Sequence, residues 1–454
     1  MRLFSRADAA ALAAAATIGA ASIAVAPQTT GAASAAMAAT FFLASVLTRL
    51  ALLVASVGAE AGDEAPALAD DALPTLTILA PVHDEADALP SLARAIGDLD
   101  YPPAKLDVKL ILEESDAATR REAERLGLDR RFDFVIVPTG GPKTKPKACN
   151  YALEAANGDV VVIYDAEDVP APDQARKAAA AFAAGGEDLV CVQARLNFYN
   201  ADENWLTRLF ALDYALWFDN MLPGLQRIGA PIPLGGTSNF LKTDKLRELG
   251  AWDAFNGTED ADLGFRFARA GLRSALIAST TMEEANGALG NWLRQRSRWM
   301  KGYMQTWRVH ARRGAGFDAG GRFDLRSGLS CHLFLGGAVL GAIVSPWLWI
   351  AAAARVVASD EVGGFGLAAL LIGNGAIVAT YAIAPLRRGW VGLAPWALLA
   401  PVYWLLISAA AFKALGELIV RPHHWEKTTH VLGDAALRRR ASALQELAAA
   451  RSAD

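Results

Sequence analysis

Two long apolar runs separated by a short uncharged segment open the chain. The runs cover about residues 9–26 and 35–57, and the segment 27–34 between them contains Pro, Gly and Ser. About twenty consecutive apolar residues are enough for a helix to span a bilayer. The pattern therefore predicts an N-terminal transmembrane hairpin within residues 1–60, with a turn at 27–34.

Charged residues set the expected orientation of this hairpin. Arg2 and Arg6 precede the first run, so the positive-inside rule places the N-terminus in the cytoplasm and returns the chain there after the second run. A cleaved signal peptide, with processing after residues 24–26, is the alternative. Arg49 lies inside the second run, and we expect it to face protein or to reach the membrane interface.

Short apolar runs alternate with helical patterns between about residues 61 and 326. The expected strands are 76–80, 108–112, 134–137 and 160–164, and the expected helices include 85–96 and 146–156. Alternating strands and helices are typical of an α/β domain. Each strand is followed by polar residues, which is where an open parallel sheet places its ligands. The pattern predicts a cytoplasmic α/β domain over residues 61–326.

Three further apolar stretches follow at about 329–354, 365–384 and 395–420. They predict transmembrane or interfacial helices over residues 327–420, so the α/β domain is inserted between membrane helices. Arg387 and Arg388 indicate a cytoplasmic loop. The last stretch contains Pro401 and Lys413, and it either crosses the membrane or forms a re-entrant or interfacial segment. Residues 421–454 then form a cytoplasmic or interfacial tail.

Composition narrows the possible partners. The 454 residues include 53% hydrophobic and 20% charged residues, which fits a mixed membrane and soluble protein. The net charge of -4 offers no basic excess for a nucleic acid backbone. The three cysteines, Cys149, Cys191 and Cys331, are too few and too scattered for a disulfide framework. No Cys/His spacing indicates zinc.

Acidic residues gather directly after the fourth expected strand, in Tyr164-Asp-Ala-Glu-Asp-Val-Pro170. Carboxylates at a strand end bind a divalent cation that also binds a diphosphate, because a hard cation prefers oxygen ligands from both sides. Asp165, Glu167 and Asp168 are the candidates. A solvated acidic turn is the alternative for this motif taken alone.

Two later motifs carry further candidate chemistry. Gly257-Thr-Glu-Asp-Ala-Asp262 opens an expected helix, and taken alone it looks like an ordinary N-cap. Gln295-Arg-Ser-Arg-Trp299 lies on a helix rich in Arg and Trp, where arginines can bind phosphate oxygens and a tryptophan can stack on a sugar. An amphipathic helix at the membrane interface is the alternative.

The order of these motifs resembles the processive branch of family 2 glycosyltransferases, which includes cellulose and hyaluronan synthases. The matching elements are Pro81-Val-His-Asp-Glu85, Asp165-Ala-Glu-Asp168, Thr258-Glu-Asp260 and Gln295-x-x-Arg298-Trp299, followed by membrane helices. Details such as Glu113-Glu-Ser-Asp116 and His424-Trp-Glu-Lys-Thr428 are similar to a bacterial subgroup of membrane transferases. The resemblance covers residues 76–307 and implies a GT-A (Rossmann-like) catalytic domain inserted between transmembrane α-helices.

The resemblance also implies roles for individual residues. The expected nucleotide-sugar site consists of Pro81, His83, Glu85, Glu113, Glu114, Lys145, Lys147, Asn150 and Asp165. Asp168 or Glu167 is expected to hold the metal, Mg or Mn. Asp260 is the implied general base, with Glu259 beside it. The acceptor and the diphosphate are expected to meet Gly236, Thr237, Ser238, Gln295, Arg296, Arg298 and Trp299.

Two positions depart from the family pattern. Glu113-Glu114 stands where the family usually has Asp-Asp against uracil, which leaves the base open. The usual Asp-x-Asp motif is Asp165-Ala-Glu167 here. Either Glu167 replaces the usual metal carboxylate or Asp168 takes over its role.

The resemblance implies an inverting, metal-dependent hexosyltransferase in the bacterial inner membrane. The expected reaction moves a hexose or N-acetylhexosamine from a UDP-sugar to a growing polysaccharide, with membrane translocation as a possible extension. Transfer of a single sugar to a lipid-linked acceptor and a non-catalytic membrane scaffold or receptor are the alternatives. Expected partners are the donor, a glycan or lipid-linked acceptor and membrane lipids, but no nucleic acid.

Overall fold

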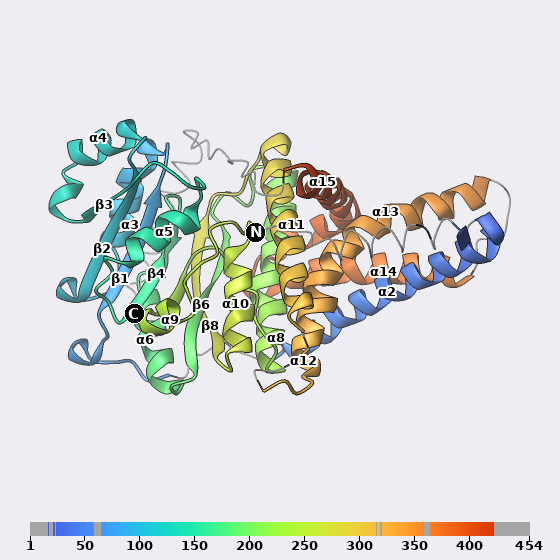
Figure 1. The fold of residues 1–454 in the computed structure, drawn as a ribbon, viewed down its shortest axis with the longest axis horizontal. Coiled ribbons are helices and arrows are strands. Elements are labelled where there is room, and N and C mark those ends of the chain that lie inside the picture. The colour runs from blue at the N-terminus through green and yellow to red at the C-terminus, as the bar shows by residue number, and fades with distance from the viewer. Residues whose placement is uncertain are drawn as a thin grey trace.

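The computed structural model describes residues 17, 21–22, 24–58, 65–314, 316–317, 320–357 and 364–421. An α/β part forms one end of the molecule, and long apolar helices project from the other end (Figure 1). Most of the first expected membrane run, 9–26, and the tail from residue 422 onward lie outside the described residues.

A single eight-stranded sheet organises the α/β part, in the order β3-β2-β1-β4-β7-β6-β8-β5. The strands are β1 Leu76–Val82, β2 Leu106–Glu113, β3 Asp133–Val137, β4 Val160–Ile163, β5 Val169–Pro170, β6 Leu189–Phe198, β7 Asn239–Lys242 and β8 Arg273–Glu283. The first four strands are parallel, with Leu76 opposite both Leu106 and Val160. β7 runs antiparallel to β4 and β6, while β6 and β8 are parallel.

The four strands expected from the pattern are confirmed, but the expectation of an open parallel sheet holds only for that half. β4 is Val-Val-Val-Ile and is buried throughout, as expected for a parallel strand covered on both faces. β5 to β8 were not expected. They contain polar residues such as Gln193 and Asn197 that are buried by the surrounding fold, so simple hydrophobic alternation does not reveal them.

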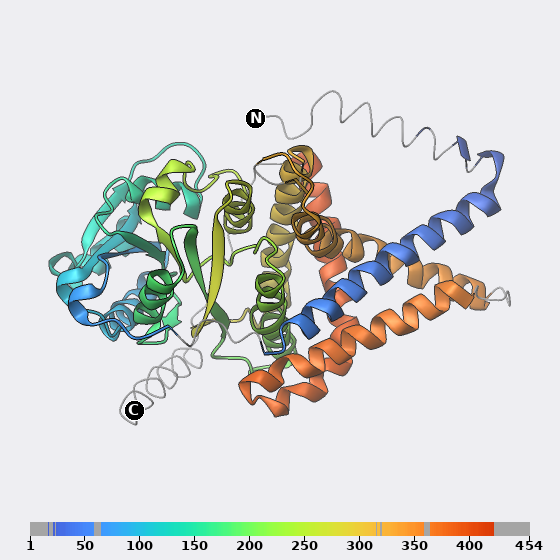
Figure 2. The same cartoon turned by 90° about the horizontal axis from the view of Figure 1, so that it is seen from below.

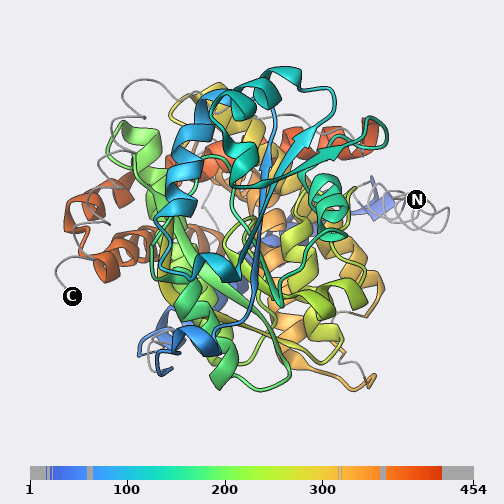
Figure 3. The same cartoon turned by 90° about the vertical axis from the view of Figure 1, so that its left-hand side faces the viewer.

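Helices cover both faces of the sheet (Figure 3). The helices of the α/β part are α3 Leu89–Gly97, α4 Ala117–Arg125, α5 Lys145–Leu153, α6 Gln174–Ala184, α7 Trp205–Leu216, α8 Leu222–Arg227, α9 Thr243–Glu248 and α10 Glu259–Arg269, and α11 Leu289–Arg312 lies between this part and the long apolar helices. A π-helical segment, Trp217–Met221, joins α7 to α8. The expected helices 85–96 and 146–156 correspond to α3, with a short 3₁₀ turn before it, and to α5.

Four helices of the described chain are long and apolar enough to span a membrane. The spans are Thr29–Ala55, Leu325–Ala354, Phe365–Arg388 and Val391–Val420. The helices that form these spans are α2 Pro27–Ala55, α12 Leu325–Gly328, α13 Gly336–Val357, α14 Gly364–Ile383 and α15 Ala400–Val420. Between α12 and α13 the helix is π-helical over Leu329–Leu335, and 3₁₀ segments Ala384–Arg388 and Val391–Leu399 precede α15.

The turn expected at residues 27–34 is wrong. These residues form the first turns of α2, which continues without a break to Ala55. Proline suits the first position of a helix because the missing N–H is not needed there, and Pro27 occupies that position. The alanines around Gly31 then favour a helix over a turn.

α2, α13 and α14 project together away from the sheet, whereas α15 lies along α11 (Figures 1 and 2). The projecting helices expose large apolar side chains such as Trp347 and Ile372, which is expected of a surface that faces lipid. One hydrophobic core joins them to the sheet, since Phe42 and Leu52 belong to the same cluster as Leu209 and Phe210 of α7. The α/β part and the long apolar helices are thus packed as one body.

Candidate active site

A cavity of about 550 Å³ lies between the carboxyl ends of the parallel strands, α10, α11 and the membrane helices. Fifteen of the expected site residues line it: Pro81, His83, Glu85, Glu113, Lys145, Asp165, Glu167, Gly236, Thr237, Glu259, Asp260, Gln295, Arg296, Arg298 and Trp299. They come from segments far apart in the sequence. The fold therefore brings the separate motifs to one place.

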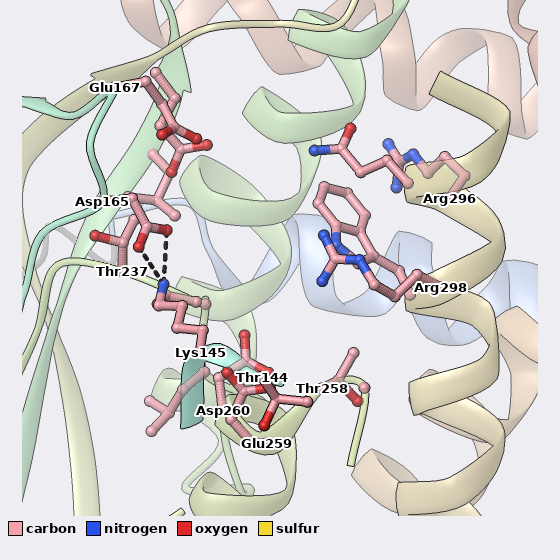
Figure 4. Close-up of a pocket in the computed structure, with 18 of the residues that line it drawn as sticks. Thr144, Lys145, Asp165, Glu167, Thr237, Thr258, Glu259, Asp260, Arg296 and Arg298 are labelled. Atoms are coloured by element: carbon pink, nitrogen blue, oxygen red, sulfur yellow. Dashed lines mark hydrogen bonds and ion pairs between the residues drawn. The ribbon is translucent and has the colours of Figure 1, made fainter. Parts of the chain in front are cut away.

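Lys145 and Asp165 form the centre of one wall. The Lys145 Nζ lies 2.5 Å from Asp165 Oδ1 and donates to the backbone oxygen of Gly236 at 2.7 Å. Burial opposes the charge of Lys145, but the Asp165 carboxylate more than compensates and holds the pKa of Lys145 above its usual value. Lys145 thus presents a fixed positive charge beside the strand-end acids (Figure 4).

Glu259 and Asp260 begin α10 and line the cavity below Lys145 (Figure 4). Burial raises the pKa of Asp260 to about 6. Burial and the Asp260 charge together raise the pKa of Glu259 to about 8. Two adjacent carboxyls whose pKa values are driven apart can hold different protonation states near neutral pH, and Asp260 is the more readily ionised of the two.

α11 forms the opposite wall and supplies Gln295, Arg296, Arg298 and Trp299. Arg298 points from this helix into the cavity, toward the wall that holds Lys145 and Asp260 (Figure 4). Arg296 instead forms an ion pair with Asp213 of α7 and stacks on the rings of Phe210 and Trp299 at 4.6 and 4.7 Å. Of the two arginines, Arg298 is therefore the better placed for a diphosphate.

The strand-end acids divide into two kinds. Glu167 lines the cavity, whereas the Asp168 side chain is fully buried and accepts hydrogen bonds from the Asp165 N–H at 2.7 Å and from the Thr237 hydroxyl. Asp168 is absent from the cavity wall. Its hydrogen bonds shape the turn that presents Asp165 and Glu167.

Residues of this wall fit a divalent cation. Asp165, Glu167 and Glu283 all line the cavity. Burial, followed by the charges of Asp168, Glu167 and Asp165, raises the pKa of Glu283 well above its usual value. Mutual repulsion between acids is what a bound divalent cation relieves, and carboxylate oxygens are the ligands that Mg and Mn prefer.

A second group of candidate metal ligands includes His83 of the cavity wall. His83, Asp84 and Asp116 have ligand atoms within 4.8 Å of one another, and together they could hold a metal ion. Asp116, however, accepts hydrogen bonds from the Asp84 N–H at 2.6 Å and the Thr119 N–H at 3.1 Å. The second of these caps α4, so Asp116 has a structural role without any metal.

Glu113 and Glu114 point in different directions. Glu113 ends β2, is buried and lines the cavity, and its Oε2 has no hydrogen-bond partner in the described part of the chain. Glu114 is exposed and accepts from the N–H and hydroxyl of Thr139 at 2.9 and 3.0 Å. Only Glu113 is placed to receive an N–H group from a ligand.

Five expected residues lie outside the cavity wall: Glu114, Lys147, Asn150, Asp168 and Ser238. Lys147 donates to the Pro138 oxygen at 2.9 Å. Asn150 exchanges hydrogen bonds with the backbone of Trp252. The Ser238 hydroxyl lies 2.6 Å from that of Thr281. These contacts hold neighbouring segments in place.

Several lining residues were not expected from the sequence. They include Arg49 of α2, Asp213, Trp217, Glu283, Tyr303 and Trp404 of α15. Glu283 is the last residue of β8, a strand that was not expected from the hydrophobic pattern. Arg49 was expected only to face protein or the membrane interface, and the rest lie on helices whose patterns indicate packing. Only the packing of the membrane helices against α7 and α11 brings them to the cavity.

The chain is similar to known proteins in sequence and in fold. The family model described as "Glycosyl transferase family group 2" matches residues 160–411. The probable glycosyltransferase YdaM of Bacillus subtilis is 27% identical over 243 residues, 51% of this chain and 55% of that protein. The beta-monoglucosyldiacylglycerol synthase of Trichormus variabilis is 27% identical over 250 residues, 52% of this chain and 51% of that protein. The chain thus spans about half the length of these curated relatives.

A solved structure shares the overall fold. The mannosyltransferase PcManGT from Pyrobaculum calidifontis, in complex with GDP-Man and Mn²⁺, superposes with a TM-score of 0.53 at 21% identity, over 81% of this chain and 99% of that one. This likeness shows the fold, which is the GT-A fold expected from the sequence.

Proposed function

Because the chain belongs to glycosyl transferase family group 2, we propose that it transfers a hexose or N-acetylhexosamine from a nucleotide sugar, with inversion, to an acceptor that reaches the cavity from the membrane. The observation that carries this proposal is the convergence of Asp260, Asp165 and Arg298 on one buried cavity. A buried base, a donor-binding wall and a diphosphate-binding cation are the parts that a single-displacement glycosyl transfer requires.

The positions of the cavity residues support a separate role for each residue that contacts the donor. Glu113 accepts a base N–H, and Lys145 and Asp165 bind the ribose or the sugar. Arg298 binds the departing diphosphate, because a guanidinium offers paired donors to phosphate oxygens. A divalent ion held by Asp165 and Glu167 would neutralise diphosphate charge when bound.

Asp260 acts on the acceptor. Its ionised carboxylate takes the proton of an acceptor hydroxyl while that oxygen bonds to the anomeric carbon and the carbon–oxygen bond to the diphosphate breaks. Attack and departure from opposite faces invert the anomeric centre. Trp299, which lines the cavity beside Arg298, offers an aromatic face to the acceptor sugar.

The acceptor side of the cavity favours a lipid-linked acceptor over a polysaccharide. Ala338 of α13 and Trp404 and Ile407 of α15 line it, so the cavity borders helices that can span a membrane. A relative at 27% identity is named for the synthesis of a glucosyl lipid. Transfer to a growing polysaccharide remains the second candidate, and the length of the product distinguishes the two.

The proposed setting is the bacterial inner membrane with the cavity on the cytoplasmic side. Nucleotide sugars are charged and water-soluble, and Arg387 and Arg388 follow α14 on the side of the molecule that carries the sheet. The positive-inside rule places such arginines in the cytoplasm.

Nucleotide release tests the proposal. Purified protein in detergent is offered UDP-, GDP- and ADP-sugars with Mg or Mn, beside the variants Asp260→Asn and Asp244→Asn. Asp244 is an exposed acid of α9 outside the cavity, so its variant controls for a lost carboxylate. We expect metal-dependent release from one donor, with UDP-sugars tested first, that falls about 10²-fold or more only in Asp260→Asn.

Two outcomes would contradict the proposal. Equal release by Asp260→Asn and the unchanged protein would exclude Asp260 as the base. Absence of both nucleotide release and nucleotide binding across the panel would favour a non-catalytic scaffold with the same fold.

A further inference from the structure

The membrane end of the cavity contains a cation that the reaction does not use. Arg49 lies in α2, within a candidate membrane span, and lines the same cavity as Asp260. An arginine within a membrane-spanning helix is costly, and it usually faces the protein interior and serves a function. The position of Arg49 therefore indicates a functional role for its charge.

The recorded contacts of Arg49 are aromatic. Its guanidinium carbon lies 5.2 Å from the ring centre of Trp404 and 5.8 Å from that of Phe334. Among the residues that the structure describes, no hydrogen bond or ion pair to Arg49 is found. Aromatic faces orient a guanidinium, but they do not neutralise its charge.

Asp213 lines the same cavity as Arg49, but its carboxylate already has other partners. It forms an ion pair with Arg296, and its Oδ1 accepts the Tyr381 hydroxyl at 2.7 Å. Arg296 also donates to the Tyr403 hydroxyl at 2.7 Å. Asp213 is thus bound by Arg296 and Tyr381, and no carboxylate among the described residues forms an ion pair with Arg49.

The surroundings of Arg49 indicate the kind of anion that would balance this charge. The cavity wall here is otherwise apolar or aromatic, with Ala338, Trp404 and Ile407 from helices that can span a membrane. A guanidinium binds phosphate oxygens with paired hydrogen bonds, and more strongly where water is excluded. An acceptor that approaches from the bilayer would bring such a phosphate attached to an apolar chain.

We propose that Arg49 binds the phosphate of a phosphorylated lipid acceptor and so selects acceptors with an anionic headgroup. This inference rests on the proposed transfer reaction and names its acceptor class. Arg49 would hold the lipid phosphate at the membrane end of the cavity, while the acceptor hydroxyl reaches Asp260.

Binding and transfer are measured separately. Binding uses purified protein and a short-chain fluorescent phosphatidic acid, with the matching diacylglycerol and inorganic phosphate as competitors. Transfer uses phosphatidylcholine vesicles that contain phosphatidylglycerol, phosphatidylinositol or diacylglycerol, each of which has a free hydroxyl, together with the donor identified by nucleotide release. The variants are Arg49→Gln, Arg49→Lys and Arg208→Gln.

Arg208 provides the matched control. It also stacks on a tryptophan, with its guanidinium carbon 4.6 Å from the Trp396 ring centre, but it does not line the cavity. We expect Arg49→Gln to weaken phosphatidic acid binding and raise the acceptor KM by roughly tenfold or more. Arg49→Lys should recover part of the loss. The donor KM, nucleotide release without acceptor and all properties of Arg208→Gln should stay unchanged.

Three results would contradict the proposed role of Arg49 in binding a lipid phosphate. Equal binding and use of diacylglycerol and the phosphorylated lipids by the unchanged protein would overturn the inference, even if Arg49→Gln failed to fold. Competition by inorganic phosphate as strong as by phosphatidic acid would show a site for free anions and would overturn the lipid assignment. Normal nucleotide release with no preference for phosphorylated lipids would leave the transferase proposal intact and remove this inference alone.

Discussion

Neighbouring acidic residues of this chain have different roles because the backbone directs their side chains to different sides. Glu113 faces the cavity with an unpartnered buried oxygen, whereas Glu114 is exposed and bound to Thr139. The same contrast separates Glu167, on the cavity wall, from the buried Asp168. The sequence of an acidic motif thus predicts the candidate ligand-binding residues. The backbone conformation determines which of their side chains reach the cavity.

Replacement of Glu113 tests base recognition. A buried carboxylate that accepts an N–H from the base contributes about 1.5–3 kcal/mol, so we expect Glu113→Gln to raise the donor KM roughly tenfold. Glu114→Gln is the matched control and should leave the KM unchanged. Steady-state kinetics over a range of donor concentrations measures both. Similar effects of the two substitutions would contradict the assignment.

The pH dependence of transfer follows from Asp260. Burial raises its pKa to about 6, so the ionised base predominates above that pH and is lost as pH falls through it. We expect kcat/KM, which reports the free enzyme, to drop about tenfold per pH unit below pH 6. A profile measured with buffers of constant ionic strength checks this expectation. A flat profile down to about pH 4.5 would exclude a base of this kind.

α11 positions the catalytic segment through close backbone packing. A Cβ at Gly302 would lie 2.6 Å from the Thr258 nitrogen and 2.7 Å from the Gly257 carbonyl carbon. These atoms immediately precede Glu259 and Asp260. The helix that supplies Arg298 therefore also fixes the location of Asp260, the proposed base.

Gly302→Ala should reduce catalysis more than folding. The added methyl group must displace the segment before α10, at a cost of about 1–3 kcal/mol of stability. A shift of the base by about 1 Å can lower kcat roughly 10²-fold. Activity and thermal unfolding in detergent measure the two effects. Gly290→Ala in the same helix is the control, because its Cβ would meet nothing within 4 Å; equal losses in both variants would refute a positioning role.

Polar contacts also connect the membrane helices to the α/β part. Arg388, after α14, donates to the fully buried Asp219 from Nε at 2.6 Å and from Nη2 at 2.8 Å. Arg387 donates to the backbone oxygens of Asp219 at 2.8 Å and of Ser56, after α2, at 2.5 Å. These contacts fasten two membrane helices to the π-helical segment that lies beside the cavity.

Asp219→Ala should destabilise the whole assembly. It leaves the Arg388 charge buried without its partner, which costs about 3–5 kcal/mol. Thermal unfolding of the purified protein in detergent measures the loss. The double variant Asp219→Leu with Arg388→Met should restore most of the stability, since replacement of both charges by apolar groups is far less costly than removal of one. An unchanged melting temperature in Asp219→Ala would show that the pair is dispensable.

Much about this protein was determined by its sequence. Long apolar runs predict membrane helices, and Val160–Ile163 predicts a buried strand, because burial and periodicity are local properties of the chain. The order of the acidic and Arg-Trp motifs indicates a family 2 glycosyltransferase, and the family match confirms it. Lys145, Asp260 and Arg298 could be named as site residues because their motifs are local.

The helix at residues 27–34 is also a local feature that the expected turn missed, because Pro27 stands at a helix start and the alanines that follow favour a helix. Tertiary structure decided the rest. The strand β6 contains Gln193 and Asn197, which are buried by the surrounding fold. Arg49, Asp213 and Trp404 come from three helices distant in sequence, and no local pattern places them in the same cavity as Glu259 and Asp260. Their meeting depends on long-range packing between the membrane helices and the sheet, which a local pattern of residues does not encode.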